Sequence, residues 1–195
     1  ESDIGELFPK IIWHTETPII RTAPTPLFML SRLVRESDFK VVLTGEGADE
    51  IFAGYNIFKE DKIRRFWARH PRSKSRPRLL EKLYPYIFSE ANQRSRQFIE
   101  GFFKKNLLQT GSPVYSHLLR WQNTYQLKSF FNDDFRGAED SIEGFVKRFS
   151  DRLPDNFMSW SPLSRAQYIE INIFLSNYLL SSQGDRMAMA NSIEG

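Results

Sequence analysis

Apolar side chains recur along most of the chain at intervals of three and four residues, the spacing of helices with one apolar face. We expect one helix to begin at Thr25-Pro26, with the threonine as N-cap and the proline in the first turn. Its apolar stripe would consist of Leu27, Leu30, Leu33 and Val34. Further helices are predicted over residues 6–15, 56–69, 79–88, 92–105, 113–123, 140–152, 162–180 and 183–192. The chain should therefore be predominantly α-helical.

A different pattern occupies residues 39–43, FKVVL, where a short apolar and β-branched run lies between Asp38 and Gly45. Such a run predicts a buried strand. One strand-turn-helix unit is not a complete parallel sheet, because such a sheet needs several strands covered on both faces. We therefore expect an α/β fragment of a single domain whose other strands lie upstream. Residues 1–55 would form a partial nucleotide-binding unit, and residues 56–195 a helical portion.

The turn after the predicted strand combines glycines with acidic residues. In VVLTGEGADEIFAGY, residues 41–55, Gly45 and Gly47 accompany Glu46, Asp49 and Glu50, without a lysine or arginine. Ligands of open α/β sheets lie beyond the carboxyl ends of the strands. Glycine lets the backbone approach a ligand there, and the N–H groups that open a helix favour an anion. Carboxylates would repel a phosphate unless a divalent cation intervened, and Mg²⁺ commonly links one or two carboxylates to phosphate oxygens.

Position along this turn separates the three carboxylates. Asp49, in the first turn of the helix, is expected to bind Mg²⁺, whereas Glu46, in the turn itself, is expected at the reacting centre. Glu50 projects about 100° further around the helix and is expected to complement the helix dipole. A tight turn before an ordinary acidic helix start would give the same short pattern. The pattern alone leaves both interpretations open.

Composition excludes several classes of site. The 195 residues include no cysteine, which excludes disulfides, thiol nucleophiles and cysteine-ligated metal centres. His14, His70 and His117 lack the spacing of a metal site and are expected to be structural or exposed. The acidic N-terminus is unlike a signal peptide, and no apolar run approaches the ~20 residues that span a bilayer. A soluble, cytoplasmic protein is expected.

Basic residues are concentrated over residues 59–82, although the net charge of the chain is only +3. One interpretation is a nucleic-acid or membrane surface, with Phe66 and Trp67 between the charges. The interpretation that we favour is a solvated helix face followed by a basic loop over residues 70–77. Neither nucleic acid nor membrane is therefore expected as a partner.

Three segments resemble segments of one family. VVLTGEGADEIFAGY resembles the (L/V)(S/T)GEG(S/A)DE(I/L)F(G/A)GY segment in the synthetase domain of glutamine-dependent asparagine synthetases. Residues 184–194, GDRMAMANSIE, are similar to that family's Asp-Arg-x-x-Met-x-x-Ser-(Ile/Leu)-Glu segment. Residues 12–34, with a Glu-x-Pro, are similar to the segment before the family's strand. We call these the first motif, the second motif and the third segment. The resemblance constrains residues 56–182 only loosely.

The resemblance implies an adenine-nucleotide α-hydrolase-like sheet and the chemistry of the ATP-pyrophosphatase group. In that chemistry the side-chain carboxylate of aspartate attacks the α-phosphate of MgATP and pyrophosphate leaves. Ammonia derived from glutamine then displaces AMP from β-aspartyl-AMP to give asparagine. By the family motif, Thr44 and Gly45 would contact ATP and Asp49 would help to hold Mg²⁺. Glu46 would serve the formation and amination of the acyl-adenylate, since a carboxylate there can accept a proton from ammonia.

The resemblance also suggests two weaker candidates for binding the acceptor substrate. Asp185, at the start of the second motif, would orient the substrate's amino group. Arg21 would bind a substrate carboxylate, although an ordinary surface arginine explains it equally well.

Several parts of the family's machinery are not present in the sequence. They are the pyrophosphate loop Ser-Gly-Gly-x-Asp-Ser, the N-terminal glutaminase domain with its cysteine nucleophile, and a downstream lysine that neutralises phosphate charge. The chain begins without methionine and stops within the second motif's pattern, so we interpret it as a fragment. We expect the isolated chain neither to hydrolyse glutamine nor to make asparagine. In the full-length protein we expect a covalently linked glutaminase domain and a possible homodimer.

Two other functions remain open. One is a relative with another acceptor acid, such as a β-lactam synthetase or a sugar- or peptide-modifying amidotransferase. Glu46 favours amination by ammonia, because lactam-forming relatives have tyrosine at that position, but it does not select asparagine among amide products. The other is a non-enzymatic helical scaffold or a basic nucleic-acid-binding module.

Overall fold

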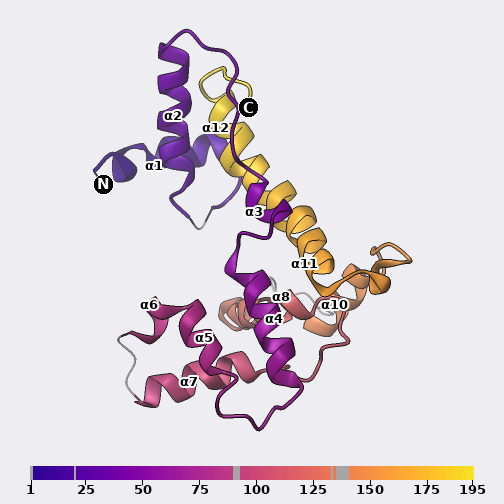
Figure 1. Cartoon of the computed structure of the whole chain (residues 1–195). Helices are drawn as coiled ribbons and strands as arrows, with labels where there is room; N and C mark the ends of the chain where they lie inside the picture. Colours follow the sequence, from indigo (N-terminus) through magenta and orange to yellow (C-terminus); the bar gives the residue numbers. More distant parts are fainter. Residues whose placement is uncertain (1, 20, 90–92, 133, 135–140) are drawn as a thin grey trace. The chain divides into compact units, whose positions relative to one another are not determined.

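The computed structural model describes residues 2–19, 21–89, 93–132, 134 and 141–195, most of which lie in helices (Figure 1). The predicted helical majority is confirmed. The chain forms two compact units. The first unit consists of Glu1–Ala53 with Tyr168–Gly195, and the second unit is Gly54–Gln167.

The first unit joins helices from both ends of the chain. They are α1 Ser2–Thr15, α2 Pro24–Glu36, α3 Ala48–Ile51, the wide π-type helix η3 Ile171–Asp185, and α12 Arg186–Met189. Helix α12 packs against α1 and α2, and Ile11, Phe28 and Met187 form the buried centre of this packing. The second motif, which includes α12, is thereby fixed on the N-terminal helices.

Polar contacts add to this attachment. The buried hydroxyl of Ser31 donates to the carbonyl oxygen of Met187 at 2.6 Å. Asn191 Nδ2 donates to the carbonyl oxygen of Phe28 at 3.1 Å and to Ser31 Oγ at 2.8 Å. Each such hydrogen bond contributes about 1 kcal/mol to stability. Together they fix the position of the second motif along α2.

The prediction of a buried strand over residues 39–43 is wrong for this chain. The described residues contain one isolated parallel bridge, between Val41 and Glu194. Val42 N–H donates to the Glu194 carbonyl at 2.9 Å, and Glu194 N–H donates to the Lys40 carbonyl at 2.9 Å. The side chains of Phe39, Val41 and Leu43 are 64%, 60% and 97% exposed. A strand is buried only where other elements cover it, and one bridge between backbones covers no side chain.

Helix α2 also differs from its prediction. It begins at Pro24, with Ala23 at the N-cap position and no side-chain cap, so Thr25 is a helical residue. The face that contacts α1 and α12 carries Pro24, Thr25, Phe28 and Ser31, the buried residues of the helix. Two leucines of the predicted stripe, Leu30 and Leu33, are 51% and 57% exposed. Apolar spacing therefore located the helix but not the face that is covered.

The second unit contains most of the predicted helices. They are α4 Asn56–Ala68, α5 Arg78–Leu83, α6 Pro85–Phe88, α7 Gln93–Lys104, α8 Tyr115–Tyr125, η1 Gln126–Phe130, α10 Ile142–Ser150, η2 Phe157–Ser159 and the start of α11 Pro162–Glu170. The predicted helix over residues 79–88 is split before Pro85, which has no N–H to continue the ladder. The predicted helix over residues 162–180 runs from α11 into η3.

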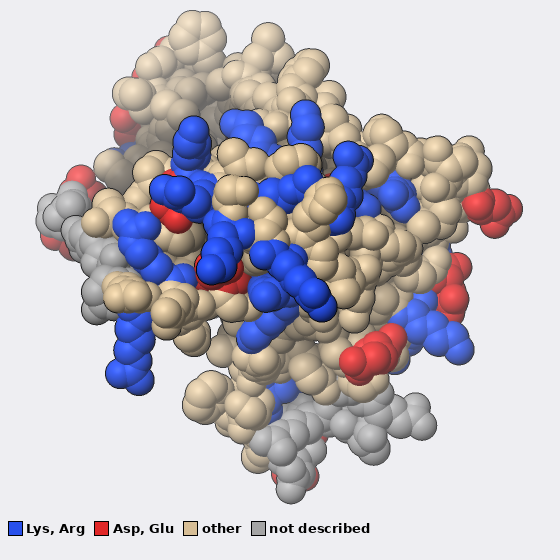
Figure 2. Space-filling model, turned by 60° about the horizontal axis from the view of Figure 1, so that its bottom comes forward, with Lys and Arg blue, Asp and Glu red and all other residues tan. Residues whose placement is uncertain are grey.

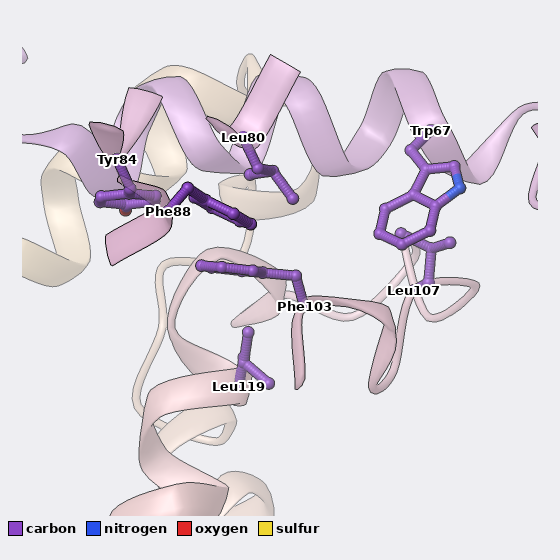
Figure 3. Packing of buried hydrophobic residues seen from close by; sticks show 7 residues of the cluster. All are labelled: Trp67, Leu80, Tyr84, Phe88, Phe103, Leu107 and Leu119. Carbon is purple, nitrogen blue, oxygen red and sulfur yellow. The ribbon is translucent and has the colours of Figure 1, made fainter. Parts of the chain in front are cut away.

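The core of the second unit is aromatic and aliphatic. Figure 3 shows its seven buried side chains: Trp67, Leu80, Tyr84, Phe88, Phe103, Leu107 and Leu119. The rings of Tyr84 and Phe103 stack with centroids 5.6 Å apart. These residues come from α4 to α8 and the loop before α8, so this core gives the second unit its own cohesion.

The basic stretch forms an exposed surface of the second unit. Between Asp61 and Glu81 the sequence has eight Lys and Arg residues and no Asp or Glu, and Figure 2 shows Lys and Arg side chains gathered on one face. Arg76 lies 4.0 Å from the centroid of the Phe66 ring, whereas Arg69 and Arg72 are exposed. These basic side chains thus lie on a solvated surface. That the protein has no nucleic-acid partner stays a prediction.

A buried carboxylate is neutralised inside the second unit. Glu60, 1% exposed, accepts a hydrogen bond from Tyr84 Oη at 2.6 Å. Arg120 Nη1 and Nη2 donate to its two carboxylate oxygens at 2.9 and 2.7 Å, a bidentate geometry. Burial, together with the Glu60 carboxylate, raises the pKa of the Tyr84 phenol. Arg120 therefore supplies the positive charge that pairs with the buried Glu60 side chain beside the aromatic core.

Replacing this arginine should destabilise the second unit. We expect Arg120→Ala to lower the free energy of unfolding by about 2 to 3 kcal/mol, because it leaves a buried carboxylate unpaired and Arg120 is itself partly exposed. The measurement is urea unfolding at neutral pH, with Arg94→Ala, an exposed arginine of α7, as the matched control. Equal stability of the two variants would contradict the role given to Arg120.

Candidate functional site

The first motif forms a tight glycine turn that opens α3. Ala48 N–H donates to the Gly45 carbonyl at 3.2 Å, and Gly47, with φ of +90°, is the N-cap residue. A positive φ of this size strains any residue with a Cβ, so glycine is needed at position 47. A Cβ there would also lie 3.4 Å from Leu175 Cδ2 of η3. The turn is thus packed closely on η3.

Glu46 lies directly against the second motif. A Cβ built on Gly184 would stand 2.5 Å from Glu46 Oε2. The Glu46 carboxylate therefore occupies the space that a side chain at position 184 would need. The side chain of Glu46 is half-buried, and its Oε1 is buried without a hydrogen-bond partner among the described residues. Two motifs that are far apart in the sequence meet at this carboxylate.

Other acidic groups surround Glu46. Burial raises the pKa of the Glu46 carboxyl, and the negative charges of Asp185 and Glu50 raise it further. Glu50 is fully buried, at 0% exposed, which the sequence pattern did not indicate. Since α3 has only four residues, its dipole is a minor reason for an acid at this position. A carboxyl group whose pKa is raised is a stronger base than an ordinary glutamate and is suited to accept a proton.

The remaining predicted residues of the turn are open to solvent. Thr44, Gly45 and Asp49 are exposed, and no atom lies within 4 Å of the position where Gly45 would carry a Cβ. Asp185, at the end of η3, is also exposed but close enough to influence the charge of Glu46. The structure therefore brings Asp185 to the turn, while the binding roles assigned to these residues stay predictions.

Arg21 takes a different place. Its guanidinium lies over two stacked rings of η3, 5.4 Å from the centroid of Phe174 and 5.8 Å from that of Tyr178. Such cation–π contacts hold an arginine against an aromatic surface. No described contact joins Arg21 to Glu46 or Asp185. The structure thus gives Arg21 a packing role on η3, and substrate binding by it stays a prediction.

The third segment reaches the same region through an ion pair. Arg186, in the Asp-Arg of the second motif, donates to the Glu16 carboxylate, which belongs to the Glu-x-Pro of the third segment. This hydrogen bond and the charge of Arg186 lower the pKa of Glu16. With the contact of Gly184 with Glu46 and the bridge between Val41 and Glu194, all three segments meet in the first unit.

The described ranges contain neither a cluster of metal-binding side chains nor a membrane-spanning helix. Among those residues, no three His, Cys, Asp or Glu side chains are grouped so as to hold a metal ion. In the same part of the chain, no helix is both long and apolar enough to cross a membrane. Asp49 as a ligand of Mg²⁺ stays a prediction.

Comparison with known protein families identifies the family of the chain. The family model described as asparagine synthase matches residues 1–195. The chain belongs to the asparagine synthase family. The resemblance of its three segments is thereby confirmed.

The individual relatives of this member of the asparagine synthase family have low sequence identity to it, and they are much longer than the chain. It is 26% identical over 208 residues to amidase chyE of Penicillium rubens and 27% identical over 201 residues to asparagine synthetase [glutamine-hydrolyzing] 1 of Bacillus subtilis. Both alignments cover 100% of the chain but only 29% and 28% of the relatives. A shorter match, 50% identical over 50 residues, covers 25% of the chain and 8% of a nodule asparagine synthetase of Pisum sativum. No solved structure matched the chain.

The acidic neighbours of Glu46 lead to a testable shift in its pKa. We expect Asp185→Asn to lower the pKa of Glu46, because it removes a negative charge that opposes ionisation. The pKa is measured by carboxyl ¹³C NMR, with the Glu46 resonance assigned from Glu46→Gln.

Asp49→Asn is the matched control, since Asp49 is not among the groups that raise the pKa of Glu46. Its Glu46 should titrate as in the wild type. If Asp185→Asn left the pKa of Glu46 unchanged, the second motif would not contribute to the electrostatics of the turn.

Proposed function

We propose that the chain is part of a synthetase that adenylates the side-chain carboxylate of aspartate with ATP and aminates it with ammonia derived from glutamine. The proposal rests on one observation. The first and second motifs of the family meet at the Glu46 carboxylate, which is half-buried, has an unpartnered oxygen among the described residues and is surrounded by acidic groups.

Glu46 suits the amination step. When ammonia attacks the acyl carbon of β-aspartyl-AMP, a C–N bond forms and the bond from that carbon to the phosphate oxygen breaks. The attacking nitrogen must also lose a proton. A carboxylate beside the acyl carbon accepts this proton, and its raised pKa makes it a better base than an ordinary glutamate. AMP leaves with the bridging oxygen, and the product is asparagine.

The exposed part of the turn suits ATP. The backbone at Gly45 is open, so a nucleotide can approach it without meeting a side chain. Thr44 offers an exposed hydroxyl beside it. These two residues would contact ATP. Asp185 would orient the amino group of the substrate. Arg21 would bind a substrate carboxylate only if its guanidinium left the aromatic rings of η3.

A divalent cation fits the charge of the turn. The carboxylates of Asp185 and Glu50 raise the pKa of Glu46, and the turn has no lysine or arginine between residues 41 and 55. A bound cation would lower the cost of this negative charge. Asp49, exposed in the first turn of α3, would hold Mg²⁺. When bound, Mg²⁺ supplies positive charge that offsets the phosphate oxygens of ATP.

The surroundings of the motifs fit a larger α/β domain. The bridge between Val41 and Glu194 is parallel, as expected at the edge of an adenine-nucleotide α-hydrolase-like sheet. Phe39, Val41 and Leu43 expose apolar side chains that helices on the faces of such a sheet would cover. A linked glutaminase domain, a homodimer and a cytoplasmic location complete the proposal for the whole protein.

A related amidotransferase with another acceptor acid is the second candidate. The amidase name of one relative that matches the whole chain is consistent with variety in this family. Glu46 supports ammonia as the attacking group in either case, whereas no residue of the described site distinguishes aspartate from another acid. A nucleic-acid-binding module is favoured by the basic surface, which lies in the second unit and not in the unit that contains Glu46.

Removing the charge of Glu46 should separate activity from stability. In the protein that contains this chain, we expect Glu46→Gln to slow asparagine formation at least ~100-fold, because a general base contributes a factor of this order. Glu36→Gln, at an exposed position of α2, is the control and should retain activity. Asparagine and pyrophosphate are measured together, and a wild-type rate for Glu46→Gln would refute the catalytic assignment.

The same variant should remain folded. The pKa of Glu46 is raised in the folded state, so its contribution to stability is present below the unfolded pKa and is lost as the pH rises through the folded pKa. At neutral pH, Glu46→Gln removes an unfavourable charge. Its free energy of unfolding should therefore equal or exceed that of the wild type.

The 195 residues alone should be inactive. Because the sequence has no pyrophosphate loop, we expect ATP–pyrophosphate exchange by the isolated chain to be no faster than that of its Glu46→Gln variant. Exchange above this background would show that the described residues suffice for adenylation.

A further inference from the structure

Gly184 is a helical glycine that the backbone does not require. It lies near the end of η3, and among the described glycines only Gly47 has a positive φ. An L-residue can therefore adopt the conformation of position 184. Glycine inside a helix is unfavourable relative to alanine, because the unfolded chain gains more conformational freedom. A local steric reason for glycine is therefore needed.

The Glu46 carboxylate provides that reason. A Cβ at position 184 would lie 2.5 Å from Glu46 Oε2, 3.3 Å from Cδ and 3.4 Å from Oε1. Apart from the neighbouring residues and the backbone of the same helix, these are the three nearest atoms, and all belong to the Glu46 side chain. The first distance is well below the separation of atoms in van der Waals contact. The space beside Gly184 is thus filled by one side chain, that of the proposed base.

We propose that Gly184 is a positioning residue that, by lacking a side chain, allows the Glu46 carboxylate to lie against η3 beside Asp185. This inference rests on the proposed function of Glu46 and extends it to a second residue. Gly184 does not touch the substrate. It acts by fixing where the carboxylate of the base stands relative to the turn that would bind ATP.

The flexibility of Glu46 determines how a substitution would act. An added methyl group would meet the end of a flexible side chain, so the carboxylate can rotate away while η3 and the turn keep their places. The displacement needed is about 1 Å, and a misplacement of this size in a catalytic group can cost about 100-fold in rate. The fold should tolerate the change far better than the reaction does.

Gly184→Ala tests the inference in the protein that contains this chain. We expect kcat for asparagine formation to fall about 100-fold, with KM for ATP and aspartate changed less than threefold. The urea midpoint of unfolding should stay at the wild-type value. Gly101→Ala is the matched control, since Gly101 is also helical and has no atom within 4 Å of an added Cβ. Its kcat should equal that of the wild type.

A pKa readout separates positioning from a general structural defect. In Gly184→Ala the carboxylate of Glu46 moves away from its half-buried place, so its pKa should fall, as measured by carboxyl ¹³C NMR. In Gly101→Ala the pKa of Glu46 should not change. This readout does not depend on the reaction. If the wild-type protein forms no asparagine, the proposed function fails while the positioning by Gly184 is still tested.

A double-mutant cycle tests the contact itself. Glu46→Asp withdraws the carboxylate by about 1.5 Å, one C–C bond, and so makes room for a methyl group at position 184. In the Glu46→Asp background, Gly184→Ala should change kcat less than about threefold, whereas it costs about 100-fold in the wild type. Equal losses in both backgrounds, or wild-type kcat and Glu46 pKa in Gly184→Ala, would overturn the inference.

The same double-mutant cycle tests the inference even if the Gly184→Ala variant does not fold. If Gly184→Ala unfolds the protein, recovery of folding in the double variant with Glu46→Asp supports the contact. An equally unfolded double variant would show that position 184 clashes with something other than Glu46 and would overturn the inference.

Discussion

The Glu46 carboxylate occupies the space where Gly184 would carry a Cβ, and this close approach joins the two sequence motifs of the chain into one site. Several other features hold the partners of this contact in place. The packing of α12 on α1 and α2, reinforced by the bond from Ser31 to Met187, fixes the second motif. The left-handed Gly47 turns the first motif onto η3 at Leu175. The acidic site exists because these two attachments place a turn and a helix end together.

The site carries an energetic cost that is consistent with function. Half-burying Glu46 near Asp185 and Glu50 opposes its ionisation and raises its pKa. Such an arrangement lowers stability at neutral pH, as expected where a reactive group is held ready for chemistry. In the second unit, by contrast, the buried Glu60 is paired bidentately with Arg120 and hydrogen-bonded by Tyr84. A neutralised carboxylate serves structure, whereas an unneutralised one is free to bind a cation or a proton.

The sequence predicted the helices better than it predicted burial. Gly47 and the acidic start of α3 follow from local backbone rules, and α4 agrees with its predicted range to within one residue. The sequence pattern predicts buried side chains at Phe39, Val41, Leu43 and Leu33, but all four are exposed. Apolar spacing shows that a segment has an apolar face, and only tertiary structure shows whether another element covers it. Gly184 carried a local signal, a glycine in a helical run, but its partner Glu46 could not be named from spacing.

The most direct test of the proposed function measures the transfer of an oxygen atom from the aspartate side chain to AMP. If the protein that contains this chain adenylates a carboxylate at the turn of Glu46, aspartate labelled with ¹⁸O in its side chain should transfer one labelled oxygen to AMP for each asparagine formed. Mass spectrometry of the AMP detects this transfer. Labelled inorganic phosphate, with ADP as the other product, would show attack on the γ-phosphate and would contradict the proposed function.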